Sequence, residues 1–193
     1  MALRETRACP VVIRLSTPTA RRGLTELTVT PGLVDDHARE LFLFAQCQML
    51  ALAIHERTGW PLWVAEQQLP TGAWSWAHVG VQTPDGRWLD IEGPRDSQQV
   101  LSWLGRWGLA VRRRLLGLAD WHVLLGRPAD TPATWWRTQI LTPESVALVE
   151  TFAEMLTEIS FARPAVDAVR QTLAAVDGTP TDPTTPDSLR RPS

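Results

Sequence analysis

Lysine, asparagine and tyrosine are all absent from this chain of 193 residues, so each of its 19 basic residues is an arginine. The three missing residue types use AT-rich codons, and their joint absence indicates a GC-rich, bacterial coding sequence. A transferase that uses amines would also benefit from having no lysine of its own to modify. That second explanation does not account for the missing asparagine and tyrosine, so the codon explanation is favoured.

Long apolar runs are also missing. No stretch of eighteen apolar residues occurs, which excludes a membrane-spanning helix. The first fifteen residues have neither the continuous apolar segment nor the small-residue cleavage pattern of a secretory signal, so we expect a cytoplasmic protein. Two cysteines do not make a disulfide framework, and Cys9, just before Pro10, is expected to be structural. A net charge of −2 gives no general attraction to nucleic acid.

Motifs for metals and nucleotides are absent as well. His55-Glu56 lacks the second histidine of an HExxH zinc motif, and there is no C-x-x-C and no glycine-rich phosphate loop. The four histidines show no paired spacing; they are His37, His55, His78 and His122. We therefore expect neither a metal nor a cofactor.

A β-hairpin is predicted around the turn sequence PDG at residues 84–86. Proline has the φ that the first turn position needs, and Gly86 can adopt the left-handed conformation that closes a three-residue loop with a G1 bulge. Strand side chains alternate between faces. This register therefore gives one apolar face, formed by Val79, Val81, Leu89 and Ile91, and one face with His78, Gly80, Gln82, Trp88, Asp90 and Glu92.

His78 and Asp90 then lie diagonally across the two strands, roughly 7–8 Å apart at the backbone and within reach of each other's side chains. Gly80, opposite Asp90, is expected to leave open space on that face. A carboxylate in this position can orient an imidazole. Glu92 faces His78 directly and is the alternative partner, and a solvated polar sheet face is the simpler interpretation of the whole set.

A helix is predicted from Cys47 to residue 58, ended by Gly59 at the C′ position. Unpaired amides and the helix dipole in its first turn would stabilise a thiolate, and the amides could also stabilise an oxyanion. Cys47 also belongs to an apolar stripe with Leu50 and Ile54, so it is alternatively a small buried hydrophobic residue. Fusion with the preceding predicted helix, residues 33–44, would remove the free amides.

The order and spacing of these residues resemble the transglutaminase-like branch of the papain-like cysteine peptidase superfamily. The resemblance covers about residues 40–95 and rests on QCxxLAxAIHxRTGxP, followed by HVxVxTPDGRWLDIEG. The layout is also similar to the leader peptidases of lasso-peptide biosynthesis, which belong to the same branch. The resemblance implies that Cys47 is the nucleophile, that His78 is the general base and that Asp90 orients the imidazole.

One feature departs from the papain-type pattern, in which an oxyanion glutamine precedes the cysteine by several residues. Leu41 and Phe42 occupy that neighbourhood here, and the nearest glutamines are Gln46 and Gln48. We expect these two glutamines to contact substrate. The side chain that would stabilise the oxyanion is left open.

The resemblance implies an α+β fold with a papain-like or transglutaminase-like core, in which the nucleophile helix packs on a small antiparallel sheet and further helices follow. It implies a thiol-dependent hydrolase or acyltransferase that acts on an amide or related acyl bond of a peptide or protein, as a peptidase, a deamidase or a transglutaminase does. The alternative is a non-catalytic interaction module that keeps the fold and binds a partner through a tryptophan-rich face.

The chain contains ten tryptophans that could form such a face. Trp76 and Trp88 share the face of His78 in the predicted register, so we expect them to form the wall of a substrate groove, and we expect most of the others to pack in the core.

Other strands are predicted over 10–15, 25–30 and 62–67, and helices after Asp96, after Thr142 and over about 164–176. The run 112–114, all arginine, suits a solvated strand edge or helix face. Residues 1–176 form one predicted domain, and the proline- and threonine-rich residues 177–193 a disordered tail.

Overall fold

The computed structural model describes residues 9–106, 108–139 and 141–176; the predicted disordered tail, 177–193, lies outside these residues. The chain divides into two compact units, one that ends at Ser160 and one that begins at Phe161. The first unit holds every strand of the described residues and all of the predicted site. It is a mixed α/β structure, as the sequence predicts.

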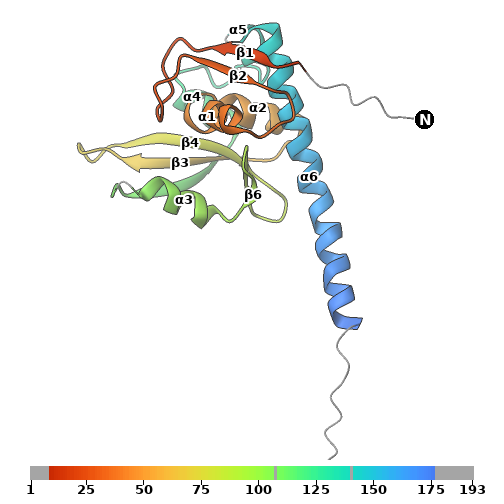
Figure 1. The fold of residues 1–193 in the computed structure, drawn as a ribbon. Helices are drawn as coiled ribbons and strands as arrows, with labels where there is room; N and C mark the ends of the chain where they lie inside the picture. The colour runs from red at the N-terminus through yellow and green to blue at the C-terminus, as the bar shows by residue number, and fades with distance from the viewer. Residues whose placement is uncertain (1–8, 107, 140, 177–193) are drawn as a thin grey trace, which may run out of the picture. The chain divides into compact units, whose positions relative to one another are not determined.

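A five-stranded antiparallel sheet lies at the centre of the first unit, in the order β6-β5-β4-β3-β7 (Figure 1). The predicted hairpin register is confirmed, because Gln82 pairs with Trp88 across it. Gly86 has a φ of 81° and closes the loop. The strands are β3 (Leu62–Gln68), β4 (Trp74–Gln82), β5 (Trp88–Asp90), β6 (Gly93–Arg95) and β7 (Val111–Leu116).

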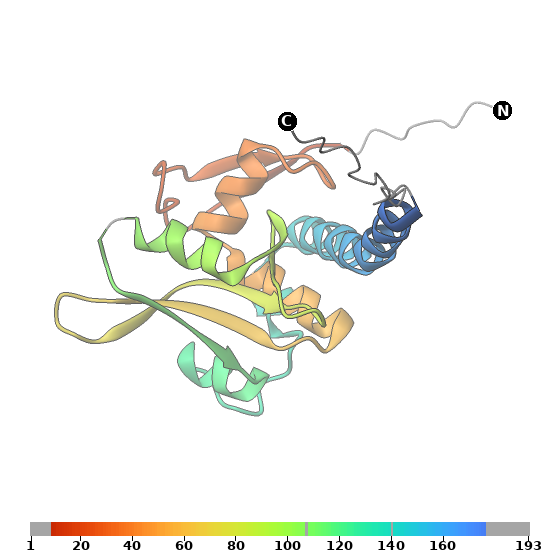
Figure 2. The ribbon, with the colours of Figure 1, turned by 90° about the horizontal axis from the view of Figure 1, so that it is seen from below.

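Helices cover both faces of this sheet, because both faces carry large side chains that must be buried (Figures 1 and 2). The helices α1 (Asp36–Phe44) and α2 (Cys47–Thr58) lie on one face and α3 (Ser97–Gly105) on the other. The core under α2 contains the predicted apolar face of the hairpin, Val79, Val81, Leu89 and Ile91. The core under α3 is separate and contains Trp63, Ala65, Trp88, Val100 and Leu104.

The break between α1 and α2 decides where the thiol lies. α1 ends at Phe44 and α2 begins at Cys47, so the two predicted helices do not fuse. The N–H groups of both Ala45 and Gln46 return to the carbonyl of Leu41, which closes α1 before α2 begins. At the other end, Gly59 takes the left-handed conformation, with a φ of 70°, and stops α2 where the sequence predicts.

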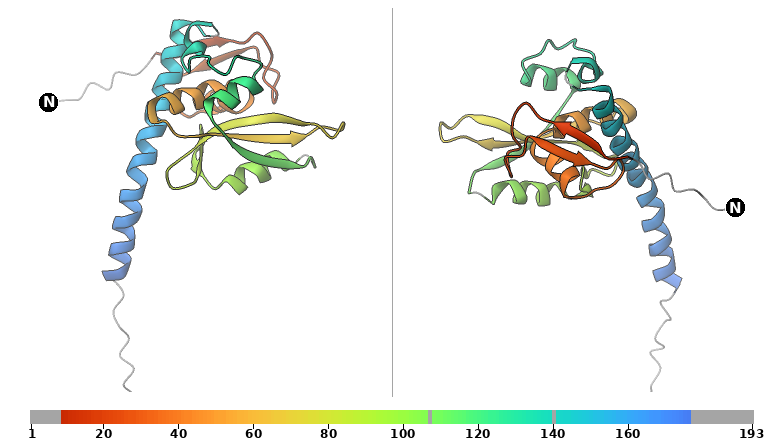
Figure 3. Two further views of the ribbon diagram at one scale, coloured as in Figure 1. Left: turned by 180° about the vertical axis from the view of Figure 1, so that it is seen from behind. Right: turned by 45° about the horizontal axis from the view of Figure 1, so that its top comes forward.

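Smaller elements complete the first unit (Figure 3). The strands β1 (Val11–Arg14) and β2 (Glu26–Val29) pair into a separate two-stranded sheet. Two short helices that the sequence analysis does not predict are α4 (Leu118–Leu124) and α5 (Trp135–Gln139). The run 112–114 lies on β7, at one end of the sheet order, as a solvated strand edge.

The long C-terminal helix α6 (Pro143–Val176) begins directly after Thr142, as predicted. The prediction of a separate last helix is wrong, because α6 continues through Pro164 without a break. Its part in the first unit contributes Leu148, Val149, Phe152, Ala153 and Leu156 to the core under α2. The described part of the second unit is the continuation of the same helix from Phe161.

Candidate active site

The predicted histidine and carboxylate are in direct contact. Nε2 of His78 lies 2.9 Å from Oδ2 of Asp90. The two residues are 0% and 3% exposed, so this contact is shielded from water. Because Nε2 is hydrogen-bonded to Asp90, the other ring nitrogen, Nδ1, is the one that can interact with a reaction partner. Nδ1 is itself buried, and it has no hydrogen bond of standard geometry with any residue that the structure describes.

Asp90 is held as an anion by several donors at once. Oδ2 accepts hydrogen bonds from Trp88 Nε1 at 3.0 Å and from Arg95 Nη2 at 2.5 Å, in addition to its contact with His78. Oδ1 accepts from the backbone N–H of Glu92 at 2.9 Å. Burial raises the pKa of Asp90, but the hydrogen bond and charge of His78 and the charge of Arg95 outweigh it and lower that pKa below its ordinary value. A buried carboxylate with this many donors is well fixed in position.

The His78 ring is enclosed by aromatic side chains. Trp88 stacks on it at 5.7 Å between centroids, and Trp103 of α3 meets its edge at 5.9 Å. Burial lowers the pKa of His78, but its hydrogen bond with Asp90 and its interaction with the Cys47 thiol and charge raise that pKa to about 9. The raised pKa favours the protonated form of His78, whose ring lies between the Asp90 carboxylate and the Cys47 thiol.

Cys47 reaches this ring because the sheet opens beside it. β5 pairs with β4 only at Val81 and Gln82, whereas β3 pairs with β4 along its whole length. The part of β4 from Trp74 to His78 therefore has β3 as its only strand neighbour among the described residues. α2 packs against β4, and Cys47 at the start of α2 is 6% exposed.

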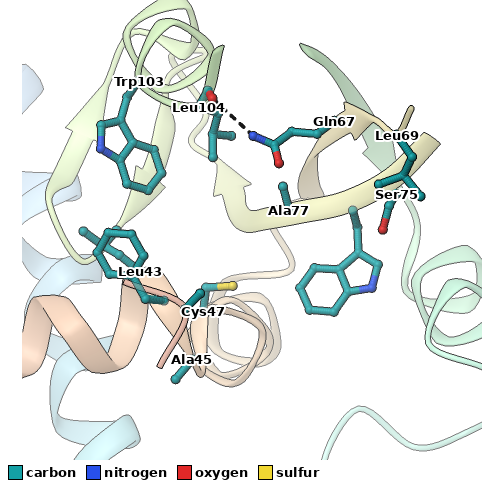
Figure 4. A pocket seen from close by; sticks show the side chains of 12 residues that line it. Leu43, Ala45, Cys47, Gln67, Leu69, Ser75, Ala77, Trp103 and Leu104 are labelled. Carbon is teal, nitrogen blue, oxygen red and sulfur yellow. Dashed lines mark hydrogen bonds between the residues drawn. The ribbon is translucent and has the colours of Figure 1, made fainter. Parts of the chain in front are cut away.

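A cavity of about 350 Å³ gives access to the sulfur of Cys47 (Figure 4). Its walls come from α1 and α2, from the paired strands β3 and β4, and from α3. Gln67 Nε2 donates to the carbonyl of Leu104 at 3.2 Å and so ties β3 to α3 across one side. The labelled lining residues include Leu43, Cys47, Gln67, Ala77 and Trp103. His78 does not line the cavity, because it is buried behind these side chains.

The two glutamines that flank the thiol line a neighbouring cavity of about 520 Å³. Gln48 Oε1 accepts a hydrogen bond from Cys47 Sγ at 3.6 Å. Gln46 is the N-cap residue of α2 and makes no side-chain capping bond. The N–H of Met49 already donates to the carbonyl of Gln46 at 3.1 Å, so the potential backbone donors toward a ligand are the amides of Cys47 and Gln48, at the first two positions of α2.

Two expectations about Trp88 and Gly80 are wrong. Trp88 is fully buried and packs between His78 and Trp63, whose ring lies 5.6 Å from its own at 22°, so it cannot form the wall of a groove. The space above Gly80 is not open, because a Cβ there would come within 2.5 Å of Trp88 Nε1. The absence of a side chain at Gly80 lets the indole nitrogen of Trp88 come close to the strand, where it donates to Asp90.

Trp76 also lies elsewhere than the predicted register implies. A β-bulge in the β3–β4 pairing leaves Ala77 without a partner, so that Ala65 pairs with His78 and Glu66 with Trp76. The extra residue reverses the side-chain alternation. Trp76 consequently packs against the core under α2 and meets Trp121 edge to face at 5.6 Å. It still lines the Cys47 cavity, but from the side opposite to the one expected.

Glu92, the alternative partner of His78, is turned away from the ring. Its Oε1 accepts from Arg39 Nε at 2.8 Å, so it forms an ion pair with α1 at the surface. Glu92 points away from His78 because β5 ends at Asp90 and Glu92 lies in the turn that leads into β6. The structure thus brings His78 together with Asp90 and with Cys47, and leaves Glu92 outside the site.

The sequence analysis missed two residues of the site. Arg95 reaches Asp90 because β6 folds back antiparallel on β5, with Gly93 opposite Asp90. Trp103 covers His78 and lines the cavity because α3 packs over that face of the sheet. The chain turns at residues 91 and 92, and the Gly93-Pro94 sequence directly after that turn could have suggested the first of these contacts. The second depends on tertiary packing alone.

Three comparisons with known proteins found no match: no protein-family model, no curated protein and no solved structure is similar to this chain. The described residues hold no group of three or more histidine, cysteine or acidic residues arranged to bind a metal. Within the same part of the chain, none of the helices combines the length and the apolar character needed to cross a bilayer.

Proposed function

We propose that the protein is a thiol-dependent hydrolase or acyltransferase with a papain-like or transglutaminase-like arrangement of Cys47, His78 and Asp90. The observation that carries this proposal is the buried His78–Asp90 contact at 2.9 Å, with Cys47 placed to interact with the same ring from the start of α2. The substrate would be an amide or related acyl bond of a peptide or protein.

The proposed reaction uses these side chains in sequence. His78 takes the proton of the thiol, and Asp90 stabilises the imidazolium that forms. The Cys47 sulfur attacks the carbonyl carbon, a C–S bond forms, and the carbonyl oxygen becomes an anion that the first amides of α2 stabilise. The oxyanion then collapses, His78 gives its proton to the leaving amine, and the C–N bond breaks. Water or a second amine attacks the thioester, loses its proton to His78 and releases Cys47.

One observation favours the alternative of a non-catalytic interaction module. Cys47 is 6% exposed, and a buried thiol is more often structural than reactive. In that case the aromatic residues around the cavity would bind a partner segment without chemistry. The contact of His78 with Asp90 beside Cys47 weighs against this alternative, because a thiol that only fills space needs no histidine oriented by a carboxylate.

Acylation by small activated esters separates the two functions. We expect p-nitrophenyl esters to produce a burst of leaving group and a protein mass increased by one acyl group, with the label on Cys47. Cys47→Ala should abolish the burst, and Cys9→Ala should preserve it. Labelling that is absent, or that is found on Cys9 alone, would favour the interaction module.

A further inference from the structure

The cavity that exposes Cys47 offers a substrate few polar groups besides the thiol. None of the 12 described residues that line it carries a charged side chain. Its walls are mainly aliphatic and aromatic, and the other polar side chains among them are Gln67 and Ser75. Ligand cavities of this kind use a small number of polar groups to orient what binds between apolar walls. The orientation of a substrate beside Cys47 therefore depends on what these side chains can accept or donate.

The amide of Gln67 is fixed in orientation by α3. Its Nε2 donates to the carbonyl oxygen of Leu104 at 3.2 Å. Leu104 lies in the last turn of α3, where backbone carbonyls have no donor within the helix. A carbonyl oxygen can only accept a hydrogen bond, so the group that faces it must be the nitrogen of the amide and not the oxygen.

This orientation leaves the oxygen of Gln67 on the side of Ala77 and Cys47, toward the cavity (Figure 4). Ser75 pairs with Gln67 across β3 and β4, yet no hydrogen bond joins the two side chains. Gln67 Oε1 is therefore an acceptor without a donor among the described residues, in a half-buried position between apolar walls. An acceptor gains most from a donor where water is scarce, and a substrate N–H can supply that donor.

We propose that Gln67 is a specificity-determining residue whose Oε1 accepts a hydrogen bond from a backbone N–H of the substrate, next to the acyl group that Cys47 attacks. The inference rests on the proposed function and names the substrate class: a peptide or protein segment whose residue in this cavity is uncharged and has an N–H. Proline has no N–H, so it is excluded at this position. A charged side chain is disfavoured, because no described lining residue can pair with it.

Matched affinity labels that differ in one N–H test the proposal, in a Cys9→Ala background that leaves Cys47 as the single thiol. Haloacetyl-leucine methylamide is compared with the ester analogue in which oxygen replaces the leucine N–H. A second set compares acetyl-leucine chloromethyl ketone with its own ester analogue, so that both chain directions are covered. Each rate is divided by the rate of the same label with β-mercaptoethanol, which removes differences in intrinsic reactivity. We expect the N–H label to react with Cys47 roughly five times faster than its ester in at least one set.

Gln68 provides the matched control for Gln67. It is the next residue on β3, and its Nε2 also donates to a backbone carbonyl, that of Gly72 at 3.1 Å, but it does not line the cavity. Gln67→Met should reduce the ratio of the two rates to about one, because methionine has a similar length and only a weak acceptor. Gln68→Met should leave the ratio unchanged. Gln67→Glu keeps an oxygen acceptor and should keep the preference for the N–H label.

The outcomes separate this inference from the proposed function. If iodoacetamide modifies Cys47 rapidly but neither label set favours the N–H, the inference is overturned, whereas the thiol chemistry stands. If Cys47 is inert toward iodoacetamide and every label, the proposed function fails, and this inference fails with it. A preference that survives Gln67→Met, or that Gln68→Met removes equally, would also overturn the assignment.

Two further controls keep the variants informative. Each ratio compares two labels on one variant, so a general loss of thiol reactivity cannot imitate the expected result. Circular dichroism establishes that each variant is folded before its ratio is used, and Gln67→Leu replaces Gln67→Met if the latter is not. Loss of the preference in Gln67→Glu as well as in Gln67→Met would mean that the shape of the side chain sets the preference, and would contradict the role of Oε1 as the acceptor.

Discussion

Asp90 Oδ2 lies 2.9 Å from His78 Nε2, and this contact leaves Nδ1 of the same ring for the thiol of Cys47. Both partners are buried, and Asp90 takes further hydrogen bonds from Trp88 and Arg95. The imidazole is therefore fixed in orientation and in tautomer by a carboxylate that cannot easily move. This arrangement determines what each nearby substitution should do.

Replacing the carboxylate by an amide should cripple acylation. In Asp90→Asn the side chain can no longer stabilise the imidazolium or enforce one tautomer, so we expect burst acylation by activated esters to slow by about two orders of magnitude or more. The fold should survive, because asparagine keeps an acceptor for Trp88 and Arg95.

Glu92→Gln is the matched control for that change. Glu92 pairs with Arg39 at the surface, two residues from Asp90, and affects the site only through its field. We expect at most about a tenfold loss of acylation rate. A large loss of acylation rate in Glu92→Gln together with a small loss in Asp90→Asn would contradict the assignment of Asp90 as the orienting carboxylate.

Gly80 should not tolerate a methyl group. A Cβ at this position would meet Trp88 Nε1 at 2.5 Å and the Leu89 carbonyl oxygen at 2.6 Å, and neither the backbone nor the packed indole can move freely. We expect Gly80→Ala to lower the free energy of unfolding by about 1–3 kcal/mol in a denaturant titration. It should also slow acylation, because the indole that stacks on His78 is displaced.

Gly105→Ala provides a control within the same domain. Its Cβ would lie 3.5 Å from Val111 Cγ2, an ordinary contact, at the last residue of α3. We expect an unchanged or slightly increased free energy of unfolding. Equal losses in Gly80→Ala and Gly105→Ala would show that the Trp88 contact does not set the cost.

The hairpin was predictable from sequence because two independent patterns agree on one register. The turn residues at 84–86 require a three-residue loop, and the alternation of apolar side chains on both strands fits that loop alone. The start of α2 was less certain, since the residues before it are also helical in character. Gly59 marks its end, but the break after Phe44 depends on how Ala45 and Gln46 hydrogen-bond to Leu41.

The faces of the tryptophans were not predictable in the same way. A single bulged residue, Ala77, reverses the alternation along β4 and sends Trp76 to the other core. Trp88 was predicted on the correct face, but its burial follows from α3, which covers that face with Val100 and Leu104. Alternation gives the side of a sheet on which a residue lies. It does not show whether another element covers that side.

The pH dependence of stability should report the charged state of His78. Its pKa in the folded protein is raised to about 9, above the ordinary value of 6.5, so protonation stabilises the fold. That contribution is fully present below pH 6.5 and is lost as the pH rises through 9. We expect the free energy of unfolding of the wild type, relative to His78→Gln, to fall by up to about 3 kcal/mol between pH 6 and pH 10. A difference that is constant or rises over this range would mean that His78 is neutral in the folded protein.

The rate at which iodoacetamide modifies Cys47 and Cys9 at pH 6 tests the central claim most directly. Cys9 is exposed and Cys47 is buried, so access alone predicts faster labelling of Cys9. If His78 and the start of α2 hold Cys47 as a thiolate, mass-spectrometric mapping will show Cys47 modified at least about ten times faster than Cys9, and His78→Gln will remove that advantage. Labelling of Cys47 at a rate equal to or below that of Cys9 would contradict the account and identify Cys47 as a structural thiol.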